Sequence, residues 1–172
     1  SDCHQLHIQQ WGSGVMPLKF SMEPLPSVWD AIKPNLKAHW EEIQTDEKSG
    51  GQTFNPDKVR YFHMADIGWL VCVIARDTKT NEIAGHCLFY LVPSMHTQQI
   101  IGVEDALYLL PKHRKGMNAL RLYQACERFL WEKGAVQANV TVRPESPACG
   151  LIEKLGFRLS RLSYSKNRSE GS

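Results

Sequence analysis

The stretch of chain that decides the fold covers residues 107–120 and reads Leu-Tyr-Leu-Leu-Pro-Lys-His-Arg-Lys-Gly-Met-Asn-Ala-Leu. An apolar, strand-like run passes through Pro111 into a basic turn that holds Arg114, Lys115 and Gly116. The first turn of a helix exposes unpaired N–H groups and a partial positive charge, and glycine lets a backbone approach a ligand closely. The stretch therefore predicts a strand, a tight turn and a helix whose N-terminus suits a phosphate or pyrophosphate. The alternative is an ordinary helix start with solvated basic residues, so the surrounding elements have to decide.

The residues after the turn form the clearest helical pattern in the chain. Over residues 116–133, apolar side chains recur at three- and four-residue spacing on one stripe. The members of this stripe are Ala119, Leu122, Tyr123, Cys126, Phe129 and Leu130. Gly134 suits the position that follows a helix. The later patterns predict a strand, a short helix and a last strand, at Val136–Val142, Ala148–Leu155 and Phe157–Leu162. Because a helix precedes it, the strand at Val136–Val142 can lie parallel to the strand that ends near Leu110.

Three runs before the turn predict an antiparallel meander. They are rich in β-branched, aromatic and other apolar residues, and they cover Trp69–Ala75, Ile83–Val92 and Gln99–Leu110. A polar segment of hairpin length, Asp77–Asn81, joins the first two runs. The class is therefore mixed α and β.

The N-terminal part predicts one strand and two helices. The strand covers Leu18–Met22, and Ser27 can cap the helix that follows. Pro34 either kinks this helix or begins its main segment. A second, shorter helix is expected around Pro56–Met64. Leu6 and Ile8 alternate with polar neighbours and could add an edge strand.

The composition is that of one globular domain over residues 1–172, because 42% of the residues are hydrophobic and 22% are charged. No apolar run approaches the roughly 18 residues that cross a bilayer, and Ser1–Gln10 lacks the pattern of a signal peptide. We therefore expect no membrane attachment and a cytoplasmic location. The ends, residues 1–10 and 165–172, are expected to be flexible.

Charge and cysteine usage exclude further classes. The net charge of +2 is far from that of a dedicated nucleic-acid binder, so we expect no nucleic-acid partner. The five cysteines are widely spaced and odd in number, which indicates reduced thiols in the core. The histidines have no spacing that indicates a shared metal ion, so we expect no metal site.

The order of these elements resembles the GNAT superfamily of N-acetyltransferases. That family has three antiparallel strands, a pyrophosphate-binding turn and helix, a parallel strand, and a short helix that ends in Leu-Gly-Phe. Here the tripeptide is Leu155, Gly156 and Phe157, and the resemblance covers Trp69–Leu162. It implies an α/β fold with a mostly antiparallel sheet, a parallel pair at the cofactor wedge and flanking helices. The basic turn looks most like a subgroup common in bacteriophage genomes.

The resemblance implies acetyl-CoA as the cofactor. The family's pyrophosphate motif is Arg or Gln, two free positions, Gly, one free position, then Gly or Ala. Read from Arg114, this sequence has Met117 at the first Gly position and Ala119 at the last small position. By the family comparison, backbone amides hold the pyrophosphate, and here they belong to Arg114, Lys115, Gly116, Met117, Asn118 and Ala119. The pantetheine arm is expected to bond to the backbone of Leu109 and Leu110, and the Leu109 N–H to polarise the thioester carbonyl.

A general base is expected because the acceptor amine must be neutral to attack, and a lysine-like amine is mostly protonated at pH 7. Family members commonly place a Glu on the strand before the turn. Glu104 is the first candidate and Asp105 the second. Being adjacent, they should point to opposite faces of the sheet unless a bulge intervenes. Either could instead be a solvated or salt-bridged carboxylate. The first helix offers further candidates, namely His39, Glu41 and Glu42.

The general acid of the family is missing from its usual position. Many members have a Tyr four residues before the Gly of Leu-Gly-Phe, where this chain has Ile152. Water or a hydroxyl such as that of Tyr108 or Ser146 could protonate the leaving thiolate instead. Cys149 lies nearby in sequence and makes a covalent acetyl-cysteine route conceivable, although a buried thiol is the plainer interpretation.

Two functions follow from these patterns. The first is an acetyl-CoA-dependent N-acetyltransferase that transfers acetyl directly to a primary amine of a small molecule or protein, with Glu104, Asp105 and Tyr108 as catalytic candidates. The second is a non-catalytic protein of the same fold that binds a partner protein, with or without coenzyme A. Because only one strand is visible after Gly156, a homodimer is one way to complete the sheet.

Overall fold

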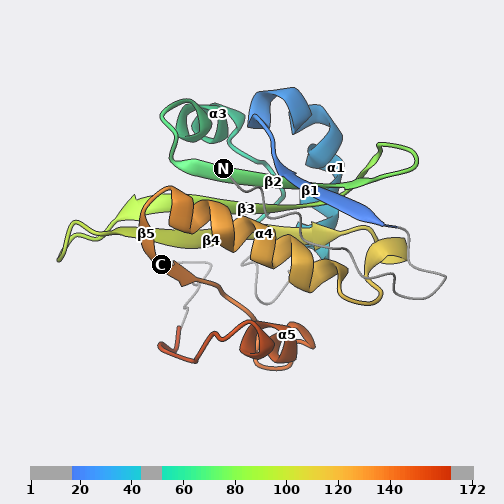
Figure 1. Cartoon of the computed structure of the whole chain (residues 1–172). Coiled ribbons are helices and arrows are strands. Elements are labelled where there is room, and N and C mark those ends of the chain that lie inside the picture. Colours follow the sequence, from blue (N-terminus) through green and yellow to red (C-terminus); the bar gives the residue numbers. More distant parts are fainter. Residues whose placement is uncertain (1–16, 44–51, 164–172) are drawn as a thin grey trace, which may run out of the picture.

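The computed structural model describes residues 17–43 and 52–163. The expected edge strand at Leu6 and Ile8 and both flexible ends lie outside the described residues. The described residues form a mixed α/β fold around one five-stranded sheet (Figure 1). Its strands, in spatial and chain order, are β1 (Leu18–Met22), β2 (Leu70–Asp77), β3 (Ile83–Pro93), β4 (Ile100–Leu109) and β5 (Ala135–Asn139). β1 to β4 pair antiparallel and β5 pairs parallel to β4, so the predicted sheet is confirmed.

Helices cover both faces of this sheet (Figure 1). On one face lie α1 (Leu25–Ile43) and α3 (Lys58–Asp66), and on the other lies α4 (Asn118–Glu132). A 3-10 turn at Pro111–His113 connects β4 to α4, and α5 (Ala148–Lys154) follows β5. None of the described helices is both long and apolar enough to cross a membrane.

The strands alternate between two hydrophobic cores because successive side chains of a strand point to opposite faces. Val71 and Val73 of β2 pack with α4, whereas Cys72 and Ile74 pack with α1. Cys72, Cys87 and Cys126 are buried free thiols, as the cysteine usage predicted.

Two predicted features differ from the structure. α1 begins at Leu25, two residues before Ser27, and Pro34 lies inside it. Ser27 is not the cap, because its hydroxyl donates back to the Pro24 carbonyl at 2.7 Å. The strand predicted at Phe157–Leu162 is also wrong, since these residues pair with no strand in the part of the chain that the structure describes. Phe157 packs instead against the Tyr123 ring of α4, at a centroid distance of 5.4 Å, and its side chain joins the core on the α4 side of the sheet, whereas residues 158–163 are exposed.

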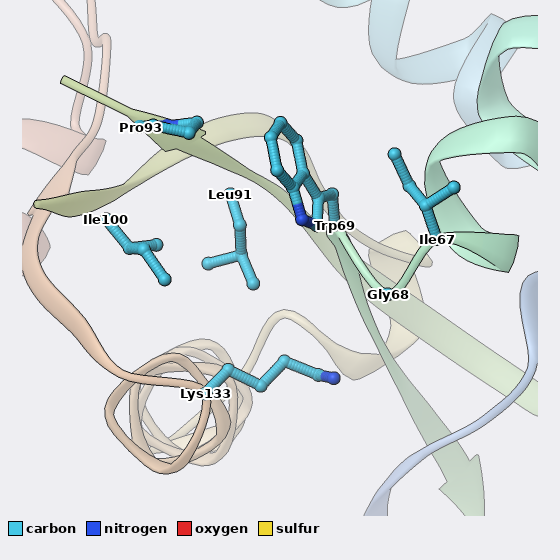
Figure 2. A pocket seen from close by; sticks show the side chains of 7 residues that line it. All are labelled: Ile67, Gly68, Trp69, Leu91, Pro93, Ile100 and Lys133. Atoms are coloured by element: carbon cyan, nitrogen blue, oxygen red, sulfur yellow. The ribbon is translucent and has the colours of Figure 1, made fainter. Parts of the chain in front are cut away.

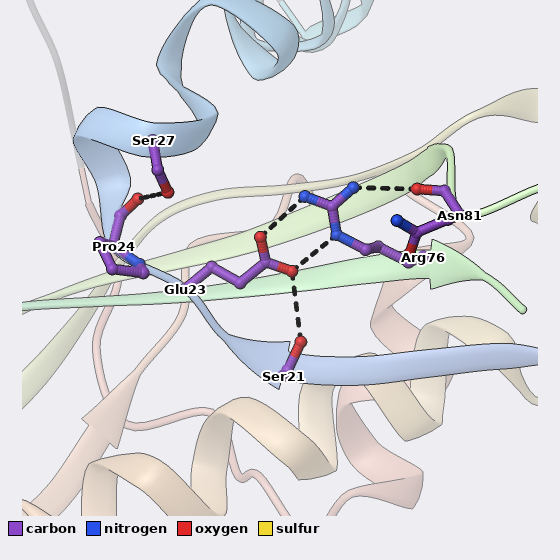
Figure 3. A network of polar contacts seen from close by, with 6 residues as sticks. All are labelled: Ser21, Glu23, Pro24, Ser27, Arg76 and Asn81. Atoms are coloured by element: carbon purple, nitrogen blue, oxygen red, sulfur yellow. Dashed lines mark hydrogen bonds and ion pairs between the residues drawn. The ribbon is translucent and has the colours of Figure 1, made fainter.

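A charged network joins the end of β1 to β2 (Figure 3). The Arg76 guanidinium donates to both carboxylate oxygens of Glu23 at 2.8 Å and to the Asn81 carbonyl at 2.9 Å. Ser21 donates a weaker hydrogen bond to Glu23 at 3.3 Å. The hydrogen bonds from Arg76 hold the pKa of Glu23 below its usual range. The two-pronged geometry makes this pair stronger than an ordinary surface ion pair.

Glu23→Gln should lower the free energy of unfolding by about 1 to 2 kcal/mol at pH 7, because it removes the charge from a half-buried bidentate pair. A carboxylate whose pKa is lowered by folding stabilises above its unfolded pKa, and this stabilisation is lost as the pH falls through the folded pKa. Urea unfolding should therefore show that the difference from the wild type shrinks toward pH 3.

The matched control is Glu41→Gln, which breaks an exposed pair with Lys37 whose closest atoms are 3.6 Å apart. Its effect should stay below about 0.5 kcal/mol at either pH. Equal effects of the two substitutions at pH 7 would contradict the role given to the Glu23 network.

β3 and β4 lie very close to each other at Gly85. A Cβ atom built on this residue would collide with the Tyr108 carbonyl oxygen and lie 2.7 Å from Leu109 Cδ2. The two strands also contain a bulge, because Leu88 pairs with Ala106 and Phe89 with Glu104, which leaves Asp105 as the extra residue. Gly85 and this bulge set the course of β4 toward the turn.

Gly85→Ala should destabilise the protein by roughly 1 to 3 kcal/mol, since backbone atoms of β4 would have to move. Gly150→Ala is the control, because a Cβ there meets nothing within 4 Å and alanine favours the helical conformation of α5. Thermal unfolding should show a loss of stability for the first variant and none for the second. A Gly85→Ala protein as stable as the wild type would refute the close approach.

Candidate functional site

The parallel pairing of β4 with β5 stops halfway along β4. The ladder joins Ile100–Val103 to Ala135–Asn139, and β4 then continues alone on this side to Leu109. We call residues 104–109 of β4, on the side of β5, the open edge. Glu104 stands at the point of divergence, where one of its carboxylate oxygens accepts a hydrogen bond from the Thr141 N–H at 3.4 Å. The open edge leaves backbone groups of β4 without a neighbouring strand among the described residues.

The direction of these backbone groups follows from the other side of β4. The Leu110 N–H donates to the Ala84 carbonyl of the β3 side at 2.8 Å. Successive residues of an antiparallel strand direct their N–H and C=O groups to alternate sides, so those of Leu109 point to the open edge. The Leu109 carbonyl there accepts a hydrogen bond from Arg114 Nε at 2.8 Å. The Leu110 N–H is thus already engaged, whereas the Leu109 N–H faces the open edge.

The turn after β4 leads directly into the N-terminus of α4. Gly116 has a φ of 66°, a conformation that favours glycine. Met117, at the N-cap of α4, makes no capping hydrogen bond with its side chain, so no cap competes for the first amides of the helix. The side-chain amide of the buried Asn118 donates to the His113 carbonyl at 3.0 Å and braces the turn from within. A glycine turn and an uncapped helix start fit an anionic group such as a pyrophosphate.

The Arg114 side chain points away from this helix start. Besides its bond to the Leu109 carbonyl, its guanidinium donates to Glu42 of α1 at 2.7 Å and lies over the Tyr108 ring at 5.0 Å from the centroid. The Arg114 side chain therefore joins the end of β4 to α1. Its backbone forms part of the turn. Lys115 and Met117 are exposed beside it, and Ala119 is half-buried against the α4 core.

Glu104 and Asp105 face opposite sides of the sheet. Glu104 is opposite Phe89, whose ring packs on Tyr123 of α4. Asp105, on the bulge, accepts a hydrogen bond from the Tyr61 hydroxyl of α3 at 2.5 Å. Burial raises the pKa of Glu104 to about 7 and also raises the pKa of Asp105. Each carboxyl group is therefore set apart from ordinary surface carboxylates by desolvation.

Tyr108 is surrounded by basic side chains on the α1 face. The buried Tyr108 ring stacks on His86 at 6.2 Å and meets the edge of His39 at 6.3 Å. His86 is fully buried, and neither ring nitrogen has a hydrogen-bond partner among the described residues. Burial lowers the pKa of His86 to about 3, so its imidazole is neutral at physiological pH.

Other candidates are placed away from the open edge or are engaged elsewhere. Glu41 lies on the exposed side of α1 near Lys37. The Cys149 thiol donates to the Arg143 carbonyl at 3.1 Å, and Ile152 packs against the α4 core. Sequence reasoning did not find the bond of Tyr61 to Asp105, because these residues are 44 positions apart and Tyr61 stands in an otherwise unremarkable helical pattern.

Three comparisons place this geometry among known proteins. Residues 32–157, more than half of the chain, match the acetyltransferase (GNAT) family. No curated protein matches the sequence. A solved structure of a probable acetyltransferase is similar, with a TM-score of 0.67 and 19% identity over 90% of this chain and 99% of that chain.

Two further solved structures are similar to this chain. An aminoglycoside acetyltransferase from an uncultured soil metagenomic sample has a TM-score of 0.68 and 18% identity, over 90% of this chain and 100% of that chain. The ribosomal-protein-alanine N-acetyltransferase of Brucella melitensis biovar Abortus 2308 has a TM-score of 0.66 and 18% identity, over 90% and 99%. At these identities the likeness shows the fold. Together with the family match, it shows that the chain is an acyltransferase that belongs to the acetyltransferase (GNAT) family.

Proposed function

We propose that this protein is an acetyl-CoA-dependent N-acetyltransferase that transfers the acetyl group directly to a primary amine. The observation that carries the proposal is the divergence of β4 from β5 directly before an uncapped helix start. Acetyl-CoA supplies an acyl group activated as a thioester. The residues of the chain have to hold its phosphates, orient the acyl group and remove a proton from the amine. Membership of the subgroup that is common in bacteriophage genomes stays a prediction.

The phosphates are assigned to the turn from Arg114 to Ala119. Gly116 and the uncapped first turn of α4 offer backbone N–H groups to a diphosphate, and Lys115 adds a positive charge. In this chain the glycine of the turn, Gly116, comes one residue before the first Gly position of the family motif, which Met117 occupies. The backbone N–H groups of the turn do not depend on the side chain at position 117. The Arg114 side chain holds β4 and α1 together instead of binding phosphate.

The acyl group is assigned to the open edge. The Leu109 N–H faces this edge and can donate to the acyl oxygen, where it stabilises the negative charge that develops during attack. The Leu110 N–H donates to the Ala84 carbonyl, which supports Leu109 over Leu110 as the backbone donor to the cofactor. Leu109 is therefore the backbone donor that we assign.

Glu104 is the proposed base and Asp105 its alternative. Glu104 stands where β4 and β5 diverge, and a pKa of about 7 leaves a useful fraction of carboxylate at neutral pH. Asp105 is bound by Tyr61 and faces α1 and α3, so it could also hold an acceptor ammonium. Tyr108, next to Leu109, is the proposed donor of a proton to the departing thiolate, because Ile152 occupies the position where relatives have a Tyr.

Two departures from the family's sequence pattern support a second candidate function. With Ile152 in place of a Tyr and Met117 in place of a Gly, the chain could bind coenzyme A and a partner protein without turnover. Acetyl-CoA binding with no thiol release on any amine would favour this function over catalysis.

The first test follows thiol release from acetyl-CoA with a panel of amines. The panel includes aminoglycosides and peptides with an N-terminal alanine, because proteins of similar structure are named for these acceptors. Glu104→Gln should lower kcat/KM by about 10²- to 10⁴-fold. The wild-type rate should rise with pH through about 7, as Glu104 loses its proton, and the variant should lack this limb.

Asp105→Asn distinguishes which of the two carboxyl groups is the general base. If this variant loses the pH limb while Glu104→Gln keeps it, Asp105 is the base.

Glu104→Gln should also be more stable than the wild type at pH 8 and not at pH 4. Folding raises the pKa of Glu104, so the ionised carboxylate destabilises the folded protein. This difference shows that the variant folds and that its loss of activity has a chemical cause.

The second test measures coenzyme A binding by thermal shift. A ligand at about 100 times its Kd stabilises a protein by roughly 2.7 kcal/mol. Met117→Glu should abolish most of this shift, because the new carboxylate repels a diphosphate, yet it suits the N-terminus of a helix and leaves the fold intact. Thr97→Glu, an equal charge change in the loop between β3 and β4, should keep the full shift. If both variants kept it, the phosphates would lie elsewhere.

A further inference from the structure

A pocket of about 270 Å³ lies at the end of the sheet opposite to the turn (Figure 2). It is formed where β2 begins, β3 ends, β4 begins and α4 ends, and it is lined by Ile67, Gly68, Trp69, Leu91, Pro93, Ile100 and Lys133. The open edge begins at Glu104, which the rise of a strand places roughly 13 Å from Ile100, and the turn assigned to the phosphates lies beyond Leu109, at most about 30 Å from Ile100. The pocket is therefore separate from the proposed acyl-transfer site and does not depend on it.

The walls of this pocket are apolar. Leu91 is buried at its base, and Ile100 and Pro93 continue the wall on the β3 and β4 side. Trp69 is 42% exposed and Ile67 is 43% exposed, although both are large apolar residues. Figure 2 shows the Trp69 ring standing over the pocket with its indole nitrogen turned toward it. A ligand with an apolar body would cover these side chains.

The described lining residues contribute two polar side-chain groups to the pocket, and both are donors. Lys133 extends from the end of α4 along the side opposite to the Trp69 ring (Figure 2). Among the described residues, no acidic side chain belongs to the lining. The neighbouring Glu132 lies near Arg128, with 3.8 Å between their charged atoms, and does not line the pocket. The ammonium of Lys133 and the indole N–H thus leave the pocket with donors and a positive charge but no acceptor side chain.

We propose that this pocket is a binding site for a small organic anion with an apolar body. Its carboxylate binds Lys133 and the Trp69 indole N–H, and its hydrocarbon part packs on Leu91 and Ile100. The volume is just below the roughly 300 Å³ at which ligand pockets usually begin, so the ligand is smaller than a typical drug.

The test compares three probes of the same length on the full chain: hexanoate, hexylammonium and 1-hexanol. Binding is followed by tryptophan fluorescence and by calorimetry. Hexanoate should bind more tightly than 1-hexanol, and hexylammonium most weakly, because Lys133 repels it. Lys133→Met should weaken hexanoate binding about 10-fold and leave 1-hexanol binding unchanged. Trp69→Phe should remove the fluorescence change.

Two controls fix the location of the site. Lys154→Met, an equal loss of charge on α5, should leave hexanoate binding unchanged. Saturating coenzyme A should not displace hexanoate, because none of the residues that line the pocket belongs to the open edge or to the turn assigned to the phosphates. The proposal is overturned if hexanoate does not bind, if hexylammonium binds equally well, if Lys133→Met has no effect, or if coenzyme A competes.

Discussion

The hydrogen-bond ladder between β3 and β4 is the constraint on which the rest of the molecule depends. It holds β4 from one side along its whole length, while β5 holds the other side only as far as Val103. β4 therefore keeps its pairing with β3 beyond Val103, where its second edge is open. Backbone groups can therefore face a ligand there without the strand losing its course. The close approach at Gly85 and the bond from Arg114 to the Leu109 carbonyl fix the end of the strand in the same way.

The carboxyl groups of β4 illustrate how the alternation of a strand separates two environments. Glu104 and Asp105 are adjacent and face opposite sides of the sheet, and the bulge keeps Asp105 on the same side as the next residue, Ala106, where Tyr61 of α3 reaches it. One weak backbone hydrogen bond partly offsets the cost of burying Glu104, whereas Asp105 accepts the short hydrogen bond from Tyr61. Desolvation raises both pKa values, but different neighbouring groups stabilise the two carboxylates. Two neighbouring carboxyl groups can thus serve separate tasks in one site.

Local patterns predicted most elements because they report on local physics. The stripe from Ala119 to Leu130 and the Gly134 stop predicted α4, and the three apolar runs predicted the meander. The strand after Gly156 failed because Phe157 contacts Tyr123, a long-range contact with no local signal. The sequence also predicted that Glu104 lies on a strand and that a turn leads into α4, and the roles of both stay predictions. The pairing of Arg114 with Glu42 had no local signal, because it spans 72 positions.

The two margins of the described sheet have a consequence for solubility. β1 and β5 are each five residues long, and Lys19 of β1 and Gln137 of β5 are exposed polar residues. Long, flat, apolar margins recruit strands from other molecules and begin aggregates, and short margins with charged or polar side chains resist this. The longest strands, β3 and β4, lie in the interior of the sheet, and β3 has a paired neighbour on both sides. The margins of the sheet are thereby left to short strands, and on β4 the open edge is the part that lacks a neighbouring strand among the described residues.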